Sequence, residues 1–160
     1  RSPAIAELTQ LPPLRDPHLA ADWIRHRLAQ PLLARALMAP RAGLVGCVEI
    51  MLSGQDAFLC LWVGTDWQGR GWGKRLIAMG SELAQTEGAQ LLLTATLRRN
   101  LPSRAAFGRA GFSELSGRAQ PPDHDRVFLY RSATALEPPL AWQRLAAFSA
   151  RMNTGMDFTP

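Results

Sequence analysis

An apolar strand that runs directly into a glycine-rich turn and then into a helix constrains the fold of this chain more than any other feature. The segment is residues 61–76, LWVGTDWQGRGWGKRL. Gly69, Gly71 and Gly73 remove side chains where the backbone has to approach another group closely. The segment therefore predicts a turn whose backbone contacts a ligand.

The residues after the turn predict what that ligand is. The N–H groups of residues 70–74 would converge at the N-terminus of the following helix, where backbone donors are unpaired and the helix dipole is positive. Arg70, Lys74 and Arg75 add formal positive charge. The arrangement predicts an anion site, and a pyrophosphate is the anion that it suits.

Two common phosphate-binding loops do not fit this segment. A Walker A loop ends in Gly-Lys-Ser/Thr, whereas Gly73-Lys74 is followed by Arg75, and Gln68 stands where its first glycine is required. The dinucleotide fingerprint G-x-G-x-x-G is excluded because the spacing here is G-x-G-x-G.

Apolar runs, helical spacing and turn residues predict the remaining elements. Strands are expected at residues 3–11, 34–38, 44–52, 57–63, 90–97, 112–115 and 126–131, and helices at about 16–30, 74–87 and 102–111 and within 132–160. The run at 57–63 is typical of a strand buried on both faces. This alternation predicts an α/β or α+β fold with helices on the faces of one sheet.

Composition limits the function classes. The chain has 160 residues, enough for one compact domain, and a net charge of +5. Only Lys74 among its 18 basic residues is lysine. The arginines are scattered and no nucleic-acid motif accompanies them, so a compositional bias explains them better than nucleic-acid binding does.

Other simple features indicate the environment. Cys47 and Cys60 lack metal-ligand spacing, so neither a metal site nor a disulfide scaffold is expected, and the default location is cytoplasmic. No run reaches the ~20 apolar residues of a membrane helix. Because the chain begins with Arg1 rather than Met, we expect that it has been trimmed or belongs to a longer protein.

The run QGRGWG at residues 68–73 fits the pattern Q/R-x-x-G-x-G/A and resembles the acyl-CoA pyrophosphate signature of the GCN5-related N-acetyltransferase (GNAT) family. The resemblance extends to Val63 with Asp66, to residues 74–76, and to NLPSRAAFGRAGF at residues 100–112. It implies an acyl-CoA N-acyltransferase-like fold with a mixed, mostly antiparallel sheet of about six or seven strands, and the apolar spacing within 132–160 adds an extra C-terminal helix.

The resemblance also implies a division of the chain. Residues 1–132 would form the GNAT-like acyl-CoA-binding domain, and residues 133–160 a C-terminal extension with an amphipathic helix. That helix would either pack back on the domain or offer a surface to a partner, such as a second copy of the chain.

For the co-substrate, the resemblance implies acetyl-CoA and no metal. Leu61, Trp62 and Val63 would present a strand edge to the pantetheine arm, where the family splays its fourth and fifth strands. Asn100 matches a position that contacts CoA, although a helix cap is the alternative. The pyrophosphate would be held by the backbone N–H groups of Gln68, Gly69, Arg70, Gly71, Trp72, Gly73 and Lys74.

The expected acid of the family is missing. Many relatives place a tyrosine four residues before the Gly-Phe pair, and that position is Phe107, which has no proton to give. Ser103 or a water would have to substitute. Tyr130, the only tyrosine, is expected in the core or an interface.

The sequence does not single out one general base, because Ala57 stands where some relatives carry a glutamate. Glu49, Asp56 and residues 123–125 are candidates. His124 has a suitable ordinary pKa for a base, with a solvated turn as the alternative, and Glu49 would otherwise be a solvent-facing strand residue.

These observations predict an acetyl-CoA-dependent N-acetyltransferase that transfers an acetyl group directly to an amine of a small molecule or a protein. The alternative is a catalytically weak or inactive acyl-CoA-binding module. The features that favour it are Phe107, Ala57 and the C-terminal helix.

Overall fold

The computed structural model describes residues 32–39, 43–116 and 123–152, together with the single helical residues His18, Asp22 and Arg25. The strand expected at 3–11 lies outside the described residues, as does nearly all of the helix expected at 16–30. No helix among the described residues has the length and apolar character required to cross a membrane.

The elements follow in the order predicted from residue 32 onward. They are β1 (Leu32–Ala39), β2 (Gly43–Ser53), β3 (Asp56–Val63), the short 3-10 helix η1 (Thr65–Trp67), α3 (Trp72–Thr86), β4 (Leu91–Leu97), α4 (Leu101–Arg109), β5 (Ser113–Glu114), β6 (Arg126–Ser132) and α5 (Pro138–Met152).

In the described residues the strands form one six-stranded sheet in the order β1-β2-β3-β4-β6-β5. Every neighbouring pair is antiparallel except β3 and β4, which are parallel because α3 forms the crossover between them. The expected mixed, mostly antiparallel sheet is confirmed.

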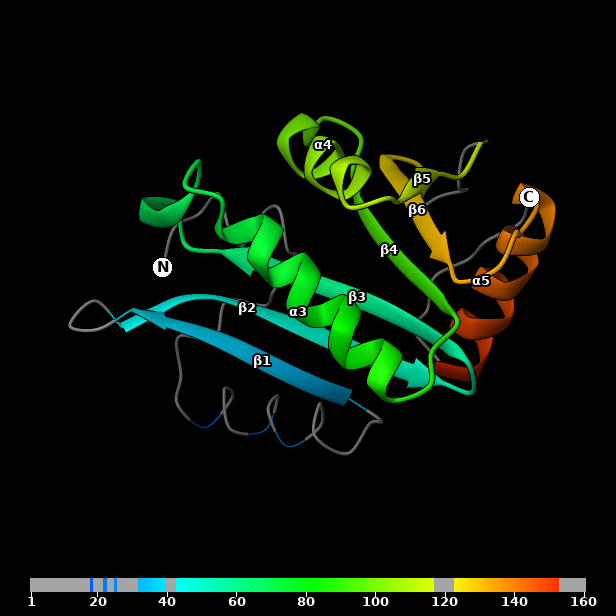
Figure 1. Ribbon diagram of the computed structural model, residues 1–160, viewed down its shortest axis with the longest axis horizontal. Helices are drawn as coiled ribbons and strands as arrows, with labels where there is room; N and C mark the ends of the chain where they lie inside the picture. Colours follow the sequence, from blue (N-terminus) through cyan, green and yellow to red (C-terminus); the bar gives the residue numbers. More distant parts are fainter. Residues whose placement is uncertain are drawn as a thin grey trace.

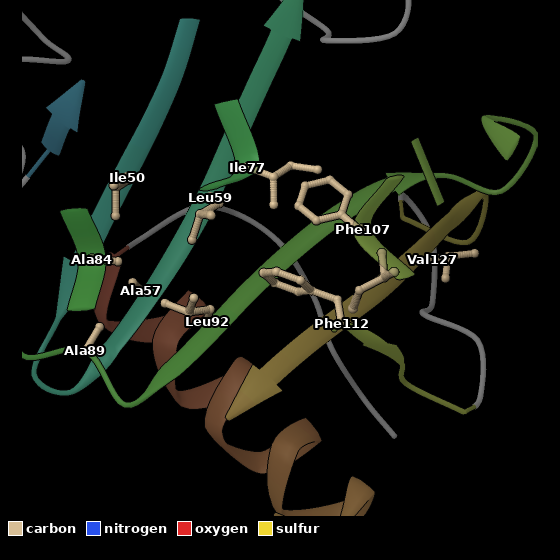
Figure 2. Packing of buried hydrophobic residues seen from close by; sticks show 11 residues of the cluster. Ile50, Ala57, Leu59, Ile77, Ala84, Ala89, Leu92, Phe107, Phe112 and Val127 are labelled. Atoms are coloured by element: carbon tan, nitrogen blue, oxygen red, sulfur yellow. The ribbon is translucent and has the colours of Figure 1, made fainter. Parts of the chain in front are cut away.

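Helices α3 and α4 cover one face of the sheet, and α5 covers part of the other (Figure 1). Figure 2 shows the apolar cluster on the α3 face, where Phe107 from α4 and Ile77 from α3 lie over Leu59 and Leu92. Alternate residues of each strand point to opposite faces. Met51 and Phe58 therefore point the other way, into a second cluster completed by α5.

Close packing of α3 depends on Gly80. A Cβ at this position would lie 2.7 Å from Cγ2 of Val48 on β2. Because glycine has no side chain, α3 can pack closely against β2 at this point. This contact holds α3 against the sheet, with its N-terminus next to the turn that follows β3.

Two sequence expectations need correction. The apolar run at 57–63 is buried only in its first half, because the later residues of β3 lose their neighbour β4 and are half-buried. The loop at 64–73 is not wholly irregular, because η1 lies within it. Its polar and glycine-rich composition gave no helical periodicity by which to find so short a turn.

Candidate active site

Strands β3 and β4 form a fork. They pair from Asp56↔Leu91 to Leu59↔Thr94 and then separate. Beyond that point β3 continues only beside β2, and β4 only beside β6, so two arms diverge (Figure 1). At the apex, the buried hydroxyl of Thr94 donates to the carbonyl of Leu59 at 2.8 Å. This bond joins the two strands at the last pair of the closed part of the sheet.

The β3 arm presents unpaired backbone to the fork. The N–H of Gly64 donates to Val45 of β2, whereas the carbonyl of Leu59 points to β4. The N–H and C=O of one strand residue point to the same edge, and this edge alternates from residue to residue, so the N–H and C=O of Leu61 point into the fork. The carbonyl of Val63 accepts from Nε2 of Gln68 at 3.3 Å, which ties the glycine-rich loop to the end of this arm.

The glycine-rich loop is open on its ligand side. Gly69 and Gly71 have φ values of +73° and +81°, a left-handed conformation that favours glycine. A Cβ at either residue, or at Gly73, would meet nothing within 4 Å. The backbone here is therefore reachable by a bulky anion.

The N-terminus of α3 has donors without acceptors in the helix. Gly71 is its N-cap and makes no side-chain cap bond, and the N–H of Arg75 makes the bond to the Gly71 carbonyl, at 3.3 Å. The amides of residues 72–74 therefore have no acceptor within the helix. The first turn contains no acidic residue and carries Lys74 and Arg75, so it is electrically suited to a diphosphate.

Two tryptophans hold two arginines beside this loop. The guanidinium of Arg70 lies 5.4 Å from the ring centre of Trp67, and that of Arg75 lies 4.9 Å from Trp72. The two rings meet edge to face at 6.3 Å. Cation–π stacking keeps both positive charges close to the anion-binding turn.

The β4 arm leads into α4, where Asn100 and Ser103 lie. The side-chain oxygen of Asn100 accepts from the backbone N–H of Ser103 at 3.2 Å, so Asn100 is the N-cap of α4. This is the capping alternative from the sequence. The cap places both residues at the beginning of α4, on the sheet face that α3 also covers.

Glu49 lies on the opposite face. It pairs with Cys60, the first residue of β3 beyond the fork apex, and is half-buried. Burial raises the pKa of the neighbouring Cys47 thiol, and the negative charge of Glu49 raises it further. Glu49 thus lies on β2, the strand directly beside the β3 arm.

His124 is exposed and precedes β6, next to the outer end of the β4 arm, where the N–H of Arg98 donates to the carbonyl of Asp125 at 2.7 Å. Asp123 is buried and pairs with Arg126 at 2.7 Å. The three predicted catalytic residues do not form one cluster, because Glu49 and Ser103 lie on opposite faces and His124 lies at the end of a strand. Among the described residues no group of three or more His, Cys, Asp or Glu side chains is arranged to hold a metal ion.

Other candidates have structural partners. Asp56 is 5% exposed and pairs with Arg144 and with Arg151 of α5, far from the open end of the fork. Phe107 is buried against Phe112 with ring centres 5.0 Å apart, and the hydroxyl of Tyr130 donates to the carbonyl of Leu136 at 3.3 Å. None of these three presents a free proton carrier to the fork.

Sequence reasoning missed Thr94 and Trp67. Two hydroxyl side chains in the otherwise apolar strand LLLTATL, Thr94 and Thr96, were the available signal, since a buried hydroxyl requires a partner. Nothing in the sequence showed that Trp67 stacks with Arg70, because η1 was not predicted.

Comparison with known proteins agrees with this geometry. Residues 6–112 match the acetyltransferase (GNAT) family. No curated protein matches the sequence.

The fold is similar to that of several solved acetyltransferases. Spermidine N-acetyltransferase from Vibrio cholerae, solved with CoA and spermine, is 15% identical with a TM-score of 0.68 over 81% of this chain and 82% of that chain. Ribosomal-protein-alanine N-acetyltransferase from Brucella melitensis is 20% identical with a TM-score of 0.60 over 74% and 80%. YncA from Salmonella typhimurium, solved with acetyl-CoA, is 15% identical with a TM-score of 0.63 over 76% of each chain.

At these identities the solved structures support the fold alone, whereas the family match covers more than half of the sequence. The forked sheet, the open glycine-rich loop and the match over residues 6–112 together show that the chain belongs to the GNAT acetyltransferase family.

Proposed function

We propose that this chain is an acetyl-CoA-dependent N-acetyltransferase that moves the acetyl group directly from the thioester to an amine. The observation that carries the proposal is the separation of β3 from β4 after Leu59 and Thr94, beside a turn suited to a diphosphate. One end of a long thioester would be anchored at the turn and the other end held in the fork.

The donor would bind in an extended form. Its diphosphate would accept from the amides of residues 69–74, because the N–H of Gln68 already donates to the carbonyl of Thr65 at 3.3 Å. Its amide-containing arm would pair with the unpaired N–H and C=O of Leu61. The N–H of Val63 would contribute through the same strand edge, whereas the backbone of Trp62 faces β2, and Asn100 would contribute from the start of α4. That several solved relatives in fold are complexes with CoA or acetyl-CoA supports this co-substrate.

The amine would attack from the face opposite α3. It has to be neutral to attack, so a base is required. Glu49 would take the proton directly or through a water, because it lies on that face one strand from the β3 arm. The C–N bond forms as the C–S bond breaks, and the electron pair leaves on the CoA sulfur.

The departing thiolate would receive its proton without a tyrosine. Phe107 is buried and aromatic, so Ser103 or solvent would supply the proton. His124 is a second candidate base for acceptors that reach the outer end of the β4 arm. A CoA thiol is a good leaving group, and general acid assistance is worth about 10²–10⁴-fold, so turnover does not require it.

We also infer a cytoplasmic location, which is supported by Cys47 and Cys60 not being joined in a disulfide. We also propose a homodimer that forms through α5, where the apolar side chain of Leu140 is exposed.

The second candidate is an acyl-CoA-binding module without useful catalysis, and buried Phe107 favours it. Release of free CoA thiol from acetyl-CoA, measured with a broad amine panel, separates the two. The proposal predicts amine-dependent release that falls about 10²–10⁴-fold in Glu49→Gln. Release that stays at the rate without protein for every amine, while acetyl-CoA still raises the melting temperature, would establish the binding module instead.

A further inference from the structure

A buried hydroxyl on the β4 arm has no partner in the described part of the chain. Thr96 is 8% exposed, and its side chain makes no hydrogen bond there. Thr94, two residues earlier on the same strand, uses its hydroxyl to bind the carbonyl of Leu59 at 2.8 Å. Because buried hydroxyl groups in proteins are nearly always bonded, the unused donor of Thr96 indicates a place for a group from outside the chain.

The side chain of Thr96 lies on the sheet face that α3 and α4 cover. Alternate residues of a strand point to opposite faces. On β4, Ala95 packs against the cluster that α5 completes, whereas Leu92 belongs to the cluster on the α3 face (Figure 2). Thr96 is an even number of residues from Leu92 and so shares its face. The side chain of Leu61 on β3 packs against the same cluster, so both arms of the fork contribute to this face.

The register of the closed sheet shows which residue Thr96 faces across the fork. The last parallel pair of β3 and β4 is Leu59↔Thr94. Continued by two residues on each strand, this register would place Thr96 opposite Leu61. Its hydroxyl would then bind a carbonyl of β3, as the hydroxyl of Thr94 does. Because the strands separate instead, the Thr96 hydroxyl and the unpaired peptide of Leu61 lie on the two sides of the fork.

Ser81 on α3 shows that the position of Thr96 is essential to this inference. The Ser81 hydroxyl is also buried without a hydrogen-bond partner, but it is closed to solvent in the middle of a helix. A ligand could reach it only by displacing core side chains. Thr96 lies instead on a strand whose neighbour has moved away, at the level of the one β3 residue that turns both its N–H and its C=O into the fork.

Resting on the proposed function, we propose that Thr96 binds the donor. Its hydroxyl donates a hydrogen bond to an amide carbonyl of the donor's arm, which takes the place that the Leu61 carbonyl would have in an unforked sheet. The arm is held from both sides, by the backbone of Leu61 on β3 and by the side chain of Thr96 on β4. A carbonyl oxygen has two lone pairs and can accept from both strands. The fork thus selects an extended thioester whose arm contains a secondary amide.

Calorimetric titration with acetyl-CoA tests this assignment in Thr96→Val, which keeps the shape of the side chain but removes the hydroxyl. We expect the Kd to rise about five- to tenfold, because a hydrogen bond to a buried carbonyl is lost. Stability in urea should not fall, since the hydroxyl gives up no bond among the described residues. Thr96→Ser keeps the hydroxyl and should bind like the wild type. An equal loss of affinity in Thr96→Ser would assign the effect to packing and overturn the proposal.

Ser81→Ala is the matched control, because it removes another buried hydroxyl on the α3 face, one that is closed to the fork. Its Kd for acetyl-CoA should be unchanged. Equal Kd values in the wild type and Thr96→Val would overturn the role of Thr96 and leave the proposed function standing. Absence of acetyl-CoA binding to the wild type would overturn the proposed function itself.

Discussion

The two ends of β3 are built in opposite ways. At the closed end, residues 56–59 are paired on both sides and buried, and Asp56 is held by two arginines of α5. At the open end, residues 60–63 are paired on one side and half-buried. Packing and ion pairing are concentrated where the sheet is complete, which allows the other end to retain unpaired backbone for a ligand.

The largest contrast is expected from adding the same side chain at the two ends. Gly71→Glu places bulk and negative charge against the diphosphate site at a residue with φ +81°, and should weaken acetyl-CoA binding at least about 100-fold. Gly54→Glu is the matched control, because Gly54 also has positive φ and open space but lies in the turn at the closed end. Calorimetric titration of both variants measures the contrast. Equal affinities would remove the loop from the donor site.

Loss of the carboxylate at the closed end should reduce stability and not binding. Asp56→Asn leaves Arg144 and Arg151 without their partner, and we expect a loss of about 2–3 kcal/mol in the free energy of unfolding, because the carboxylate is buried but the arginines are partly exposed. Urea unfolding measures the loss, and acetyl-CoA affinity should be unchanged in the folded variant.

The exposed pair Arg104–Glu114 provides the comparison for Asp56. Glu114→Gln should change stability much less, because water screens the pair. The hydrogen bond from Arg104 lowers the pKa of Glu114, so its small contribution is present above the ordinary carboxyl pKa and is lost as the pH falls through the lowered value. If Glu114→Gln proved as costly as Asp56→Asn, the closed end would have no special role.

The apex of the fork should respond more weakly. Thr94→Val keeps the shape of the side chain but removes the bond to the Leu59 carbonyl, and should cost about 1–2 kcal/mol in unfolding. Thr96→Val is the control, since Thr96 is also buried on β4 but lies beyond the apex. Similar losses in both variants would show that the Thr94 bond does not close the fork.

The smallest expected effect reports on Cys47 and Glu49 of β2, next to the open end of β3. Cys47 should alkylate more slowly than an ordinary thiol near pH 8, because its raised pKa leaves less thiolate. Glu49→Gln removes one cause of the raised pKa and should increase the rate roughly threefold. Glu82→Gln, an exposed change on α3, should leave the rate unchanged. Mass spectrometry of the Cys47 peptide follows the reaction, and an unchanged rate in Glu49→Gln would contradict an effect of that carboxylate on Cys47.

Much of the open end was predictable because its signals are local. The glycines, the helix after them and the strand before them are contiguous, so their order predicted both the turn and its ligand class. The predicted helix at 74–87 is confirmed as α3, with its first turn two residues earlier because Gly71 takes the N-cap. Asn100 matched two roles, and only the structure revealed its bond to Ser103.

The closed end was not predictable in the same way. Asp56 is 88 and 95 residues away in sequence from the two arginines that hold it, and no local pattern joins them. The point at which β3 and β4 part depends on register, which follows from packing on both faces of the sheet rather than from either strand alone. The position of Glu49 beside the open end of β3 depends in the same way on the register of β2 and β3.

Amide hydrogen exchange with and without acetyl-CoA tests the central claim most directly, because it reports both ends of β3 in one experiment. We predict added protection at residues 61–74, where backbone amides would bind the diphosphate and the arm, and no change at residues 56–59, which are already paired on both sides. Protection confined to residues 56–59, or no change anywhere at saturating acetyl-CoA, would contradict the assignment of the open fork as the donor site.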